Sequence, residues 1–174
     1  MDTDIINTKL ASQLAIINDI HNVADNNPDA FKAMMIACQY QPEAVQYILD
    51  SKYCSKELLL QQNKNGTNAL MFACQDQPEA VKYILDSQYC SEELLMQQNN
   101  NSVSALLYAC EYRPKVIQYI LDSEHCSEQM FMQQNKKGHD ALMVACQYQP
   151  EAVHYICESK YSPQLKKNIN NNLM

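Results

Sequence analysis

Four prolines recur every 36 residues, and this period limits the possible folds more than any other feature of the chain. They are Pro42, Pro78, Pro114 and Pro150. Aligned on these prolines, the chain contains four copies of one segment, at about 30–65, 66–101, 102–137 and 138–161, where the last copy becomes degenerate. A period of this length is typical of repeat proteins in which each unit packs only against its neighbours.

Each copy predicts two helices of about eight residues and a third, shorter one. In the second copy the first helix is expected at Ala69–Asp76, where Leu70, Ala73 and Cys74 share one helical face. Pro78 ends this helix and begins the next, because proline at the first helical position loses no needed N–H bond. Ser91 is expected to cap the short third helix. Helices this short are unstable alone, so the pattern predicts an all-α stack of repeats.

The two ends of the chain depart from the repeat. Residues 1–24 contain a longer amphipathic pattern, which predicts an N-terminal capping helix over the first repeat. Residues 162–174 predict a C-terminal cap followed by a frayed tail. The four repeats are therefore expected to occupy residues 25–161, between two capping helices.

The composition argues against several classes of protein. The chain has 174 residues, a net charge of −7 and 47% hydrophobic residues, as expected for one folded domain. No window reaches about 18 consecutive apolar residues, so no membrane span is expected. The first residues lack the order of basic then apolar residues found in secretory signals. The acidic balance opposes binding to a phosphate backbone, so no nucleic-acid partner is expected.

The eight cysteines follow the repeat and therefore predict packing. Seven of them form two columns with the 36-residue period, at Cys38, Cys74, Cys110 and Cys146 and at Cys54, Cys90 and Cys126. No Cys-x-x-Cys pair occurs, so neither a zinc site nor another metal or cofactor is expected. Free, buried thiols in a reducing cytoplasm fit this pattern.

Two possible chemical pairings are also interpreted as packing. His154 and Cys157 stand three residues apart, and His139-Asp140 precedes Cys146. Two ligands do not make a metal site, and a cysteine of a repeat column is expected to be buried and unreactive. The methionines that recur with the period, such as Met71 and Met143, are expected mostly in the core.

The repeated segment resembles the ankyrin repeat. Residues 66–74, Gly-Thr-Asn-Ala-Leu-Met-Phe-Ala-Cys, followed by Val81-Lys82-Tyr83-Ile84-Leu85, are similar to the family pattern G-x-T-P-L-H-x-A and V-x-x-L-L. The resemblance covers about residues 25–161 and implies an ankyrin-like helical solenoid. The period is longer than the family's usual ~33 residues, because the serine-capped turn is added.

Other departures from the family pattern generate expectations about local structure. Asn68-Ala69 and Met71 replace the Thr-Pro and His of the family, so the usual hydrogen bonds at the helix start are expected to be lost. Ala30 and Ser102 stand where glycine is expected, which predicts distorted turns in the first and third copies. Thr67 becomes His139 and Asn68 becomes Asp140, and these variable positions are expected to be free of stacking constraints.

The resemblance also implies where a partner would bind. In ankyrin-like stacks, the residue after the turn glycine and the end of the first helix line the concave face. Carried over by column, these positions are Phe31, Thr67, Val103 and His139 after the turn, and Tyr40, Asp76, Tyr112, Arg113 and Tyr148 at the helix ends. The tyrosines have the composition of a binding hot spot, but packing over the inter-helix loop explains them equally well. Both interpretations remain open at this point.

The resemblance implies a non-catalytic, monomeric scaffold that binds a partner protein through its concave face. The richness in Asn, Gln, Lys and Ile looks like that of ankyrin-like proteins from intracellular bacteria and large viruses, which act on host proteins in a host cytoplasm. One alternative is a self-associating structural module or the targeting arm of a larger enzyme. Another is the Pumilio-type RNA-binding repeat, which shares the period but uses a basic concave face that this chain lacks.

Overall fold

The structure, a computed structural model, describes residues 27–52 and 54–161. The capping segments expected at 1–24 and 162–174 lie outside the described residues. Inside them the chain forms eleven helices. In chain order they are α2 (Asn27–Tyr40), α3 (Pro42–Leu49), α4 (Lys56–Leu60), α5 (Ala69–Asp76), α6 (Pro78–Leu85), α7 (Glu92–Met96), α8 (Ala105–Tyr112), α9 (Pro114–Asp122), α10 (Glu128–Met132), α11 (Ala141–Tyr148) and α12 (Ala152–Glu158).

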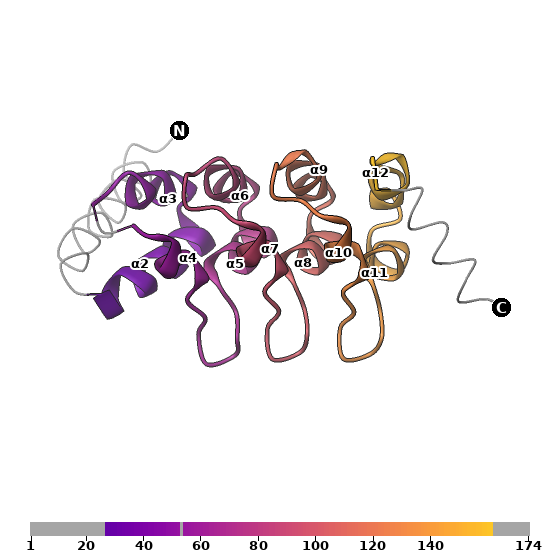
Figure 1. The fold of residues 1–174 in the computed structure, drawn as a ribbon, viewed down its shortest axis with the longest axis horizontal. Helices are drawn as coiled ribbons and strands as arrows, with labels where there is room; N and C mark the ends of the chain where they lie inside the picture. The colour runs from indigo at the N-terminus through magenta and orange to yellow at the C-terminus, as the bar shows by residue number, and fades with distance from the viewer. Residues whose placement is uncertain (1–26, 53, 162–174) are drawn as a thin grey trace, which may run out of the picture.

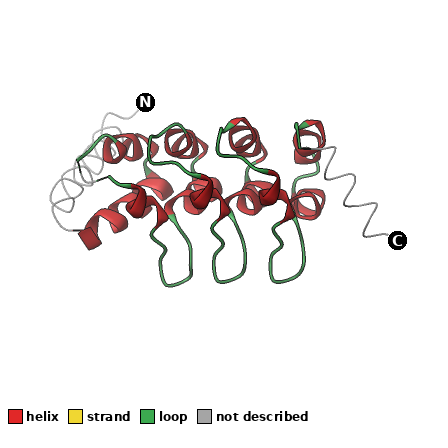
Figure 2. Ribbon diagram, in the orientation of Figure 1, coloured by secondary structure: helices red, strands yellow, loops and turns green. Residues whose placement is uncertain are grey.

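The helices stack in two layers, as Figure 1 shows. The first helices of the repeats (α2, α5, α8 and α11) contact one another in order and form the inner layer. The second helices (α3, α6, α9 and α12) form the outer layer in the same order. The hairpin loops that precede α5, α8 and α11 project away from both layers (Figure 2). The expected all-α repeat solenoid is therefore confirmed. Within the described residues, no helix is long and apolar enough to span a membrane.

The prolines begin the outer helices in three of the four repeats. Pro42, Pro78 and Pro114 occupy the first turn of α3, α6 and α9, and the bounds expected for α5 and α6 are confirmed. The fourth repeat differs, since α12 begins only at Ala152. There the Ala152 amide donates to the Gln149 carbonyl at 2.8 Å, so the segment after Pro150 starts as a turn.

Two inner helices, α5 and α11, have a side-chain hydrogen bond at their start, which corrects the expectation that such bonds are lost. The Asn68 side chain accepts a hydrogen bond from the Met71 amide at 2.9 Å and caps α5. Asp140 caps α11 in the same way through the Met143 amide. Asn and Asp are among the best N-cap residues, so one helix cap replaces another. Thr67 and Asn68 are also buried. The expectation that these positions are free of stacking constraints is therefore wrong.

The hairpin of the third copy is not distorted by its serine. Gly66, Ser102 and Gly138 have φ values of 76°, 59° and 77°, so all three adopt the left-handed conformation. The turn hydrogen bond is equally short with serine, since the Ser102 amide lies 2.8 Å from the Asn99 carbonyl oxygen. The first copy does differ: Ala30 lies inside α2, and the chain makes no hairpin there.

Side-chain amides connect each repeat to the next. Gln97 Nε2 donates to the Leu60 carbonyl at 2.8 Å, and Gln133 Nε2 repeats this bond to Met96 at 2.7 Å. In a second column, Gln62 Nε2 donates to its own hairpin at Gly66 and to the Gln98 carbonyl of the following repeat. We call these inter-repeat hydrogen bonds rungs, and they explain why the Gln-Gln-Asn tract recurs.

The rung glutamine of the second repeat, Gln97, has an additional hydrogen-bond partner. The equivalent glutamine of the third repeat, Gln133, lacks this partner among the described residues. Asn68 Nδ2 donates to Gln97 Oε1 at 2.8 Å, so Asn68 both caps α5 and holds the rung residue. In the third repeat Ser104 replaces this asparagine and makes no cap bond. Ser104 Oγ and Gln133 Oε1 are both buried and have no hydrogen-bond partner among the described residues. Serine is too short to make the bond that asparagine makes.

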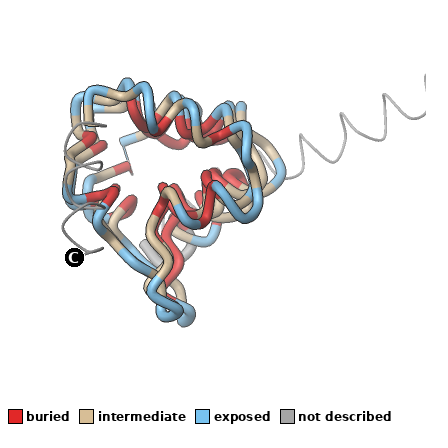
Figure 3. The backbone as a smooth tube through the Cα atoms, turned by 90° about the vertical axis from the view of Figure 1, so that its right-hand side faces the viewer, coloured by how far each residue is buried: buried red, intermediate tan, exposed pale blue. Residues whose placement is uncertain are grey.

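The core lies between the two layers of helices, where the buried residues occupy the facing sides of the tube in Figure 3. Cys74, Cys110 and Met71 are fully buried, as expected. Their counterparts in the last repeat, Cys146 and Met143, are exposed, and Cys157 is exposed as well. The expected burial of Cys146 and Cys157 is therefore wrong, because among the described residues no further repeat packs against them as α8 and α11 pack against the helices of Cys74 and Cys110.

The incomplete rung at Ser104 generates a first prediction. Ser104→Asn is expected to raise the free energy of unfolding by about 1–2 kcal/mol, since the new carboxamide can cap α8 and donate to Gln133. Asn68, which is fully buried at the equivalent position of the second repeat, shows that the stack can accommodate an asparagine there. Urea unfolding followed by circular dichroism measures the change, and Asn68→Ser should lower the stability by a similar amount. A lower stability for Ser104→Asn would show that the two sites are not equivalent.

The three hairpins generate a second prediction. Gly138→Ala is expected to lower the free energy of unfolding by about 1 kcal/mol, the cost of a left-handed non-glycine residue. Gly66→Ala should cost clearly more, because its Cβ would lie 2.8 Å from the Asn100 backbone nitrogen, whereas nothing lies near Gly138. Ser102→Gly should raise the stability by up to about 1 kcal/mol. Equal effects of the two alanine variants in urea unfolding would refute the close approach at Gly66.

Candidate functional site

Three tyrosines at the ends of inner helices are exposed. Tyr40, Tyr112 and Tyr148 end α2, α8 and α11 and have exposed fractions of 63%, 41% and 45%. The fourth member of this column, Asp76 at the end of α5, is half-buried. Large exposed aromatic side chains are uncommon on the surface of a folded domain and are enriched in protein interfaces. Their exposure favours the interface interpretation over packing alone.

Tyr112 lies in the most structured part of this column. Its ring stacks on Tyr108 with centroids 6.1 Å apart, and the Tyr108 hydroxyl accepts a hydrogen bond from Asn99 Nδ2 at 3.1 Å. Partial burial, followed by the neighbouring Glu111 carboxylate, raises the pKa of Tyr112 to about 12. The phenol therefore stays neutral across the physiological pH range. It presents an aromatic face together with a hydroxyl group that can donate a hydrogen bond.

Arg113 has a structural role in addition to its exposure. Its Nε donates to the Gln75 carbonyl of the preceding repeat at 3.1 Å. The same column holds Gln77 and Gln149, whose side-chain amides donate to Gln39 and Glu111 at 3.2 Å and 3.3 Å. Arg113 thus makes a rung to the preceding repeat, and its side chain is also exposed beside Tyr112. Sequence reasoning assigned it to binding alone.

The residues after the turns are less exposed than these tyrosines. Phe31 lies within α2 and packs against the core, since the first repeat has no hairpin. Thr67 is buried, whereas Val103 and His139 are half-buried. The backbone amides of these last three donate to the asparagine side chain that precedes each turn, at 3.0–3.1 Å. Their common feature is this hairpin hydrogen bond, and their side chains differ in character.

The asparagine of each hairpin is a residue that sequence reasoning missed. Asn63, Asn99 and Asn135 each accept two backbone hydrogen bonds through Oδ1 and so fix the hairpin beside the inner helices. The signal was present, because asparagine occupies this column in every hairpin of the chain. A short polar side chain that bonds its own backbone is a common means of fixing a tight turn.

The buried cysteines are held in the protonated, unreactive form. Burial raises the pKa of the Cys38, Cys74 and Cys110 thiols far above its usual range, and it raises the pKa of Cys54 and Cys90 to about 11. A thiolate is the reactive form, so these thiols are poor nucleophiles. Asp140 is occupied as the cap of α11. Within the described residues, no three side chains of His, Cys, Asp or Glu gather as a metal site.

Comparison with known families agrees with the architecture. A family model described as ankyrin repeats (3 copies) matches residues 6–93 and again residues 89–170. A search of curated proteins finds no match to this chain. The two family matches together span nearly the whole sequence and include all four repeats of stacked inner and outer helices. The chain belongs to the ankyrin-repeat family.

Proposed function

We propose that this chain is a non-catalytic scaffold that binds a partner protein through the face where the hairpins meet the inner helices. Ankyrin repeats are generally protein-interaction modules, which supports a protein partner. The observation that carries the proposal for this face is the row of exposed tyrosines at the ends of the inner helices, with Arg113 beside Tyr112. Tyrosine and arginine are the residues most often found in binding hot spots.

The rigidity of the row supports the same proposal. Tyr112 is held by stacking on Tyr108, and Arg113 is held by its bond to Gln75. Side chains already fixed in the free protein lose little conformational entropy on binding, so more of the contact energy remains as affinity. Asp76 interrupts the row with a carboxylate and would select a partner with a donor or a cation at that place.

A finer part of the proposal concerns the origin of the partner. The composition, rich in Asn, Gln, Lys and Ile, resembles that of ankyrin-like proteins that act on host proteins. We propose a host protein as the partner and the cytoplasm of the host cell as the place of action. The net charge of −7 favours a protein over a nucleic acid as the ligand.

Affinity capture tests the proposed face. The full chain is immobilised, and the proteins retained from a host-cell lysate are compared with those retained by Tyr112→Ala/Tyr148→Ala. We expect the double variant to retain about tenfold less of each specific partner, the usual effect of removing hot-spot aromatics. Arg113→Gln is the milder companion variant, because glutamine already makes this rung in neighbouring repeats.

Met132→Ala is the control for this capture. Met132 ends α10, outside the row of tyrosines, and is 46% exposed, close to the 45% of Tyr148. Its removal should leave capture unchanged. If the double variant retains the same proteins in the same amounts as the wild type, the assignment of the inner face is wrong. Circular dichroism melting confirms that each variant is folded.

Self-association is a second candidate, and the exposed Met143 of the last described repeat favours it. Met143 is 52% exposed, whereas Met71 and Leu107 in the same column are buried. A second copy could cover this face as a following repeat covers the others. Light scattering after size-exclusion chromatography tests the idea: dimers that Met143→Glu converts to monomers would support it. Monomers of the wild type at every concentration would exclude it.

A further inference from the structure

The outer layer carries two columns of identical chemistry. Tyrosine occupies the same place in every outer helix, at Tyr47, Tyr83, Tyr119 and Tyr155, and an acid occupies the helix end, at Asp50, Asp86, Asp122 and Glu158. The last three tyrosines pack partly against the core. The four carboxylates are exposed. The proposed binding face at the inner helices uses none of these residues.

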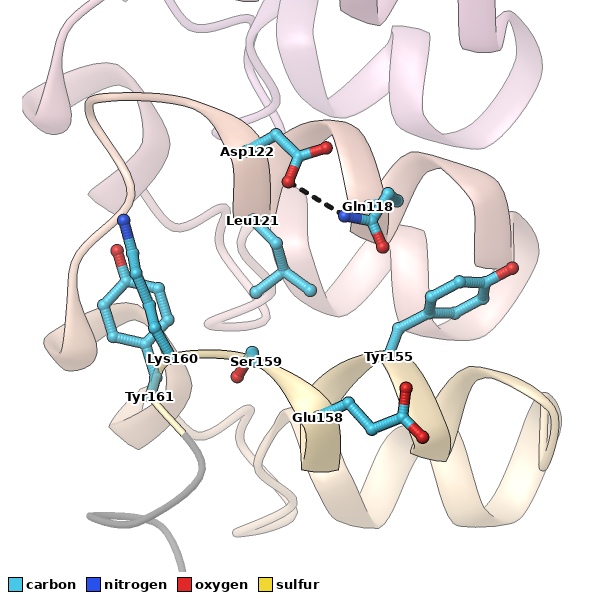
Figure 4. Close-up of a pocket in the computed structure, with 8 residues that line it drawn as sticks. All are labelled: Gln118, Leu121, Asp122, Tyr155, Glu158, Ser159, Lys160 and Tyr161. Carbon is cyan, nitrogen blue, oxygen red and sulfur yellow. Dashed lines mark hydrogen bonds between the residues drawn. The ribbon is translucent and has the colours of Figure 1, made fainter.

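Grooves open between consecutive outer helices at these columns. A cavity of about 270 Å³ lies between α6 and α9 and is lined by Leu85, Asp86, Tyr119 and Asp122, among others. One repeat further on, a cavity of about 480 Å³ lies between α9 and α12, with Leu121, Asp122, Tyr155 and Glu158 at the equivalent places. Figure 4 shows Leu121 directed into the space between the two helices, with Asp122 on one side and Glu158 on the other.

The packing of the stack accounts for these carboxylates only in part. An acid at the C-terminal end of a helix opposes the helix dipole, which favours a cation there. Side-chain hydrogen bonds from Gln46 to Asp50, at 3.0 and 3.1 Å, and from Gln118 to Asp122, at 2.8 Å, offset part of this cost. Among the described residues, no basic side chain forms an ion pair with Asp86, Asp122 or Glu158. Hydrogen bonding within the helix thus accounts for Asp50 and Asp122, but for neither Asp86 nor Glu158.

The outer layer is also negative as a whole. Each outer helix, together with the turn that follows it, contains two acids and one base, in the segments 42–52, 78–88, 114–124 and 150–160. Lys82 and Lys160 line the two grooves, and Lys160 lies over the ring of Tyr161. The excess of carboxylates remains in each groove. The surface is thus complementary in charge to a basic ligand.

We propose that these grooves bind an extended, basic polypeptide segment of a partner protein, with an arginine or lysine at every third position. Each cation meets a carboxylate of one column and the face of a tyrosine ring, while its alkyl chain covers the leucine between them. Neighbouring helices pack about 8–10 Å apart, and three residues of extended chain span about 10 Å. Successive cations therefore match the carboxylates of successive outer helices, Asp86, Asp122 and Glu158.

Peptide binding to the full-length chain tests this proposal. The probe is a fluorescein-labelled peptide of about nine residues with arginines at positions i, i+3 and i+6 between serines, a length that spans three helices. A second peptide has the same composition with its three arginines adjacent. Fluorescence anisotropy at low ionic strength should show binding of the spaced peptide, about tenfold tighter than that of the adjacent one.

Matched variants distinguish binding in the grooves from a general attraction between the acidic chain and the basic peptide. Asp86→Asn/Asp122→Asn should weaken binding of the spaced peptide about tenfold. Glu92→Gln/Glu128→Gln removes the same charge from the short helices α7 and α10 and should change it less than about twofold. Tyr119→Leu keeps the apolar packing, removes the aromatic face, and should weaken binding several-fold.

Several results would overturn the proposal. These are no binding of the spaced peptide to the wild type, equal binding of the two peptides, and equal weakening by the two double variants. Tyr112→Ala/Tyr148→Ala should bind the peptide as the wild type does, because those tyrosines lie on the inner helices. The outcome is therefore independent of whether the inner face binds its own partner.

Discussion

Hydrogen bonds from side-chain amides to the backbone of the neighbouring repeat hold this stack in register. A helix of eight residues cannot satisfy most of its end groups itself, so it depends on bonds from outside. Gln97 and Gln133 supply such bonds to Leu60 and Met96, and Gln77 and Gln149 supply them at the ends of the inner helices. The rungs fix the positions of the hairpins and of the helix ends, where the exposed tyrosines lie.

The fold could be predicted from the sequence because its signals are local and repeated. The prolines, the apolar spacing of residues 69–76 and the serine caps each determine a helix boundary within a few residues. The local details that could not be predicted depend on side chains at a distance. Asn68 caps α5 although the family pattern has other residues there, and its partner Gln97 lies 29 residues away. Ser102 keeps the glycine conformation because Asn99 holds the turn.

The candidate site could be predicted only in part. The tyrosine column followed from the repeat alignment, but its exposure depends on packing that no single copy reveals. Phe31 was grouped with the turn residues by alignment, yet α2 begins before it and leaves no turn. Cys146 and Met143 were grouped with buried columns, yet both are exposed in the last described repeat, where Ala145 and Ile156 stay buried. Expectations about burial and turns that come from the middle repeats therefore fail at some positions of the first and last repeats.

The rungs also bear on how such a protein can change its size. Glutamine donors recur at the same columns and meet backbone acceptors of an adjacent repeat, so the joints between the described repeats are chemically similar. Duplication or loss of one whole 36-residue unit within the stack would join surfaces that already fit. The tyrosine and acid columns would lengthen or shorten by one member in the same event. Evolution could thus adjust the reach of both surfaces by copying, without inventing a new contact.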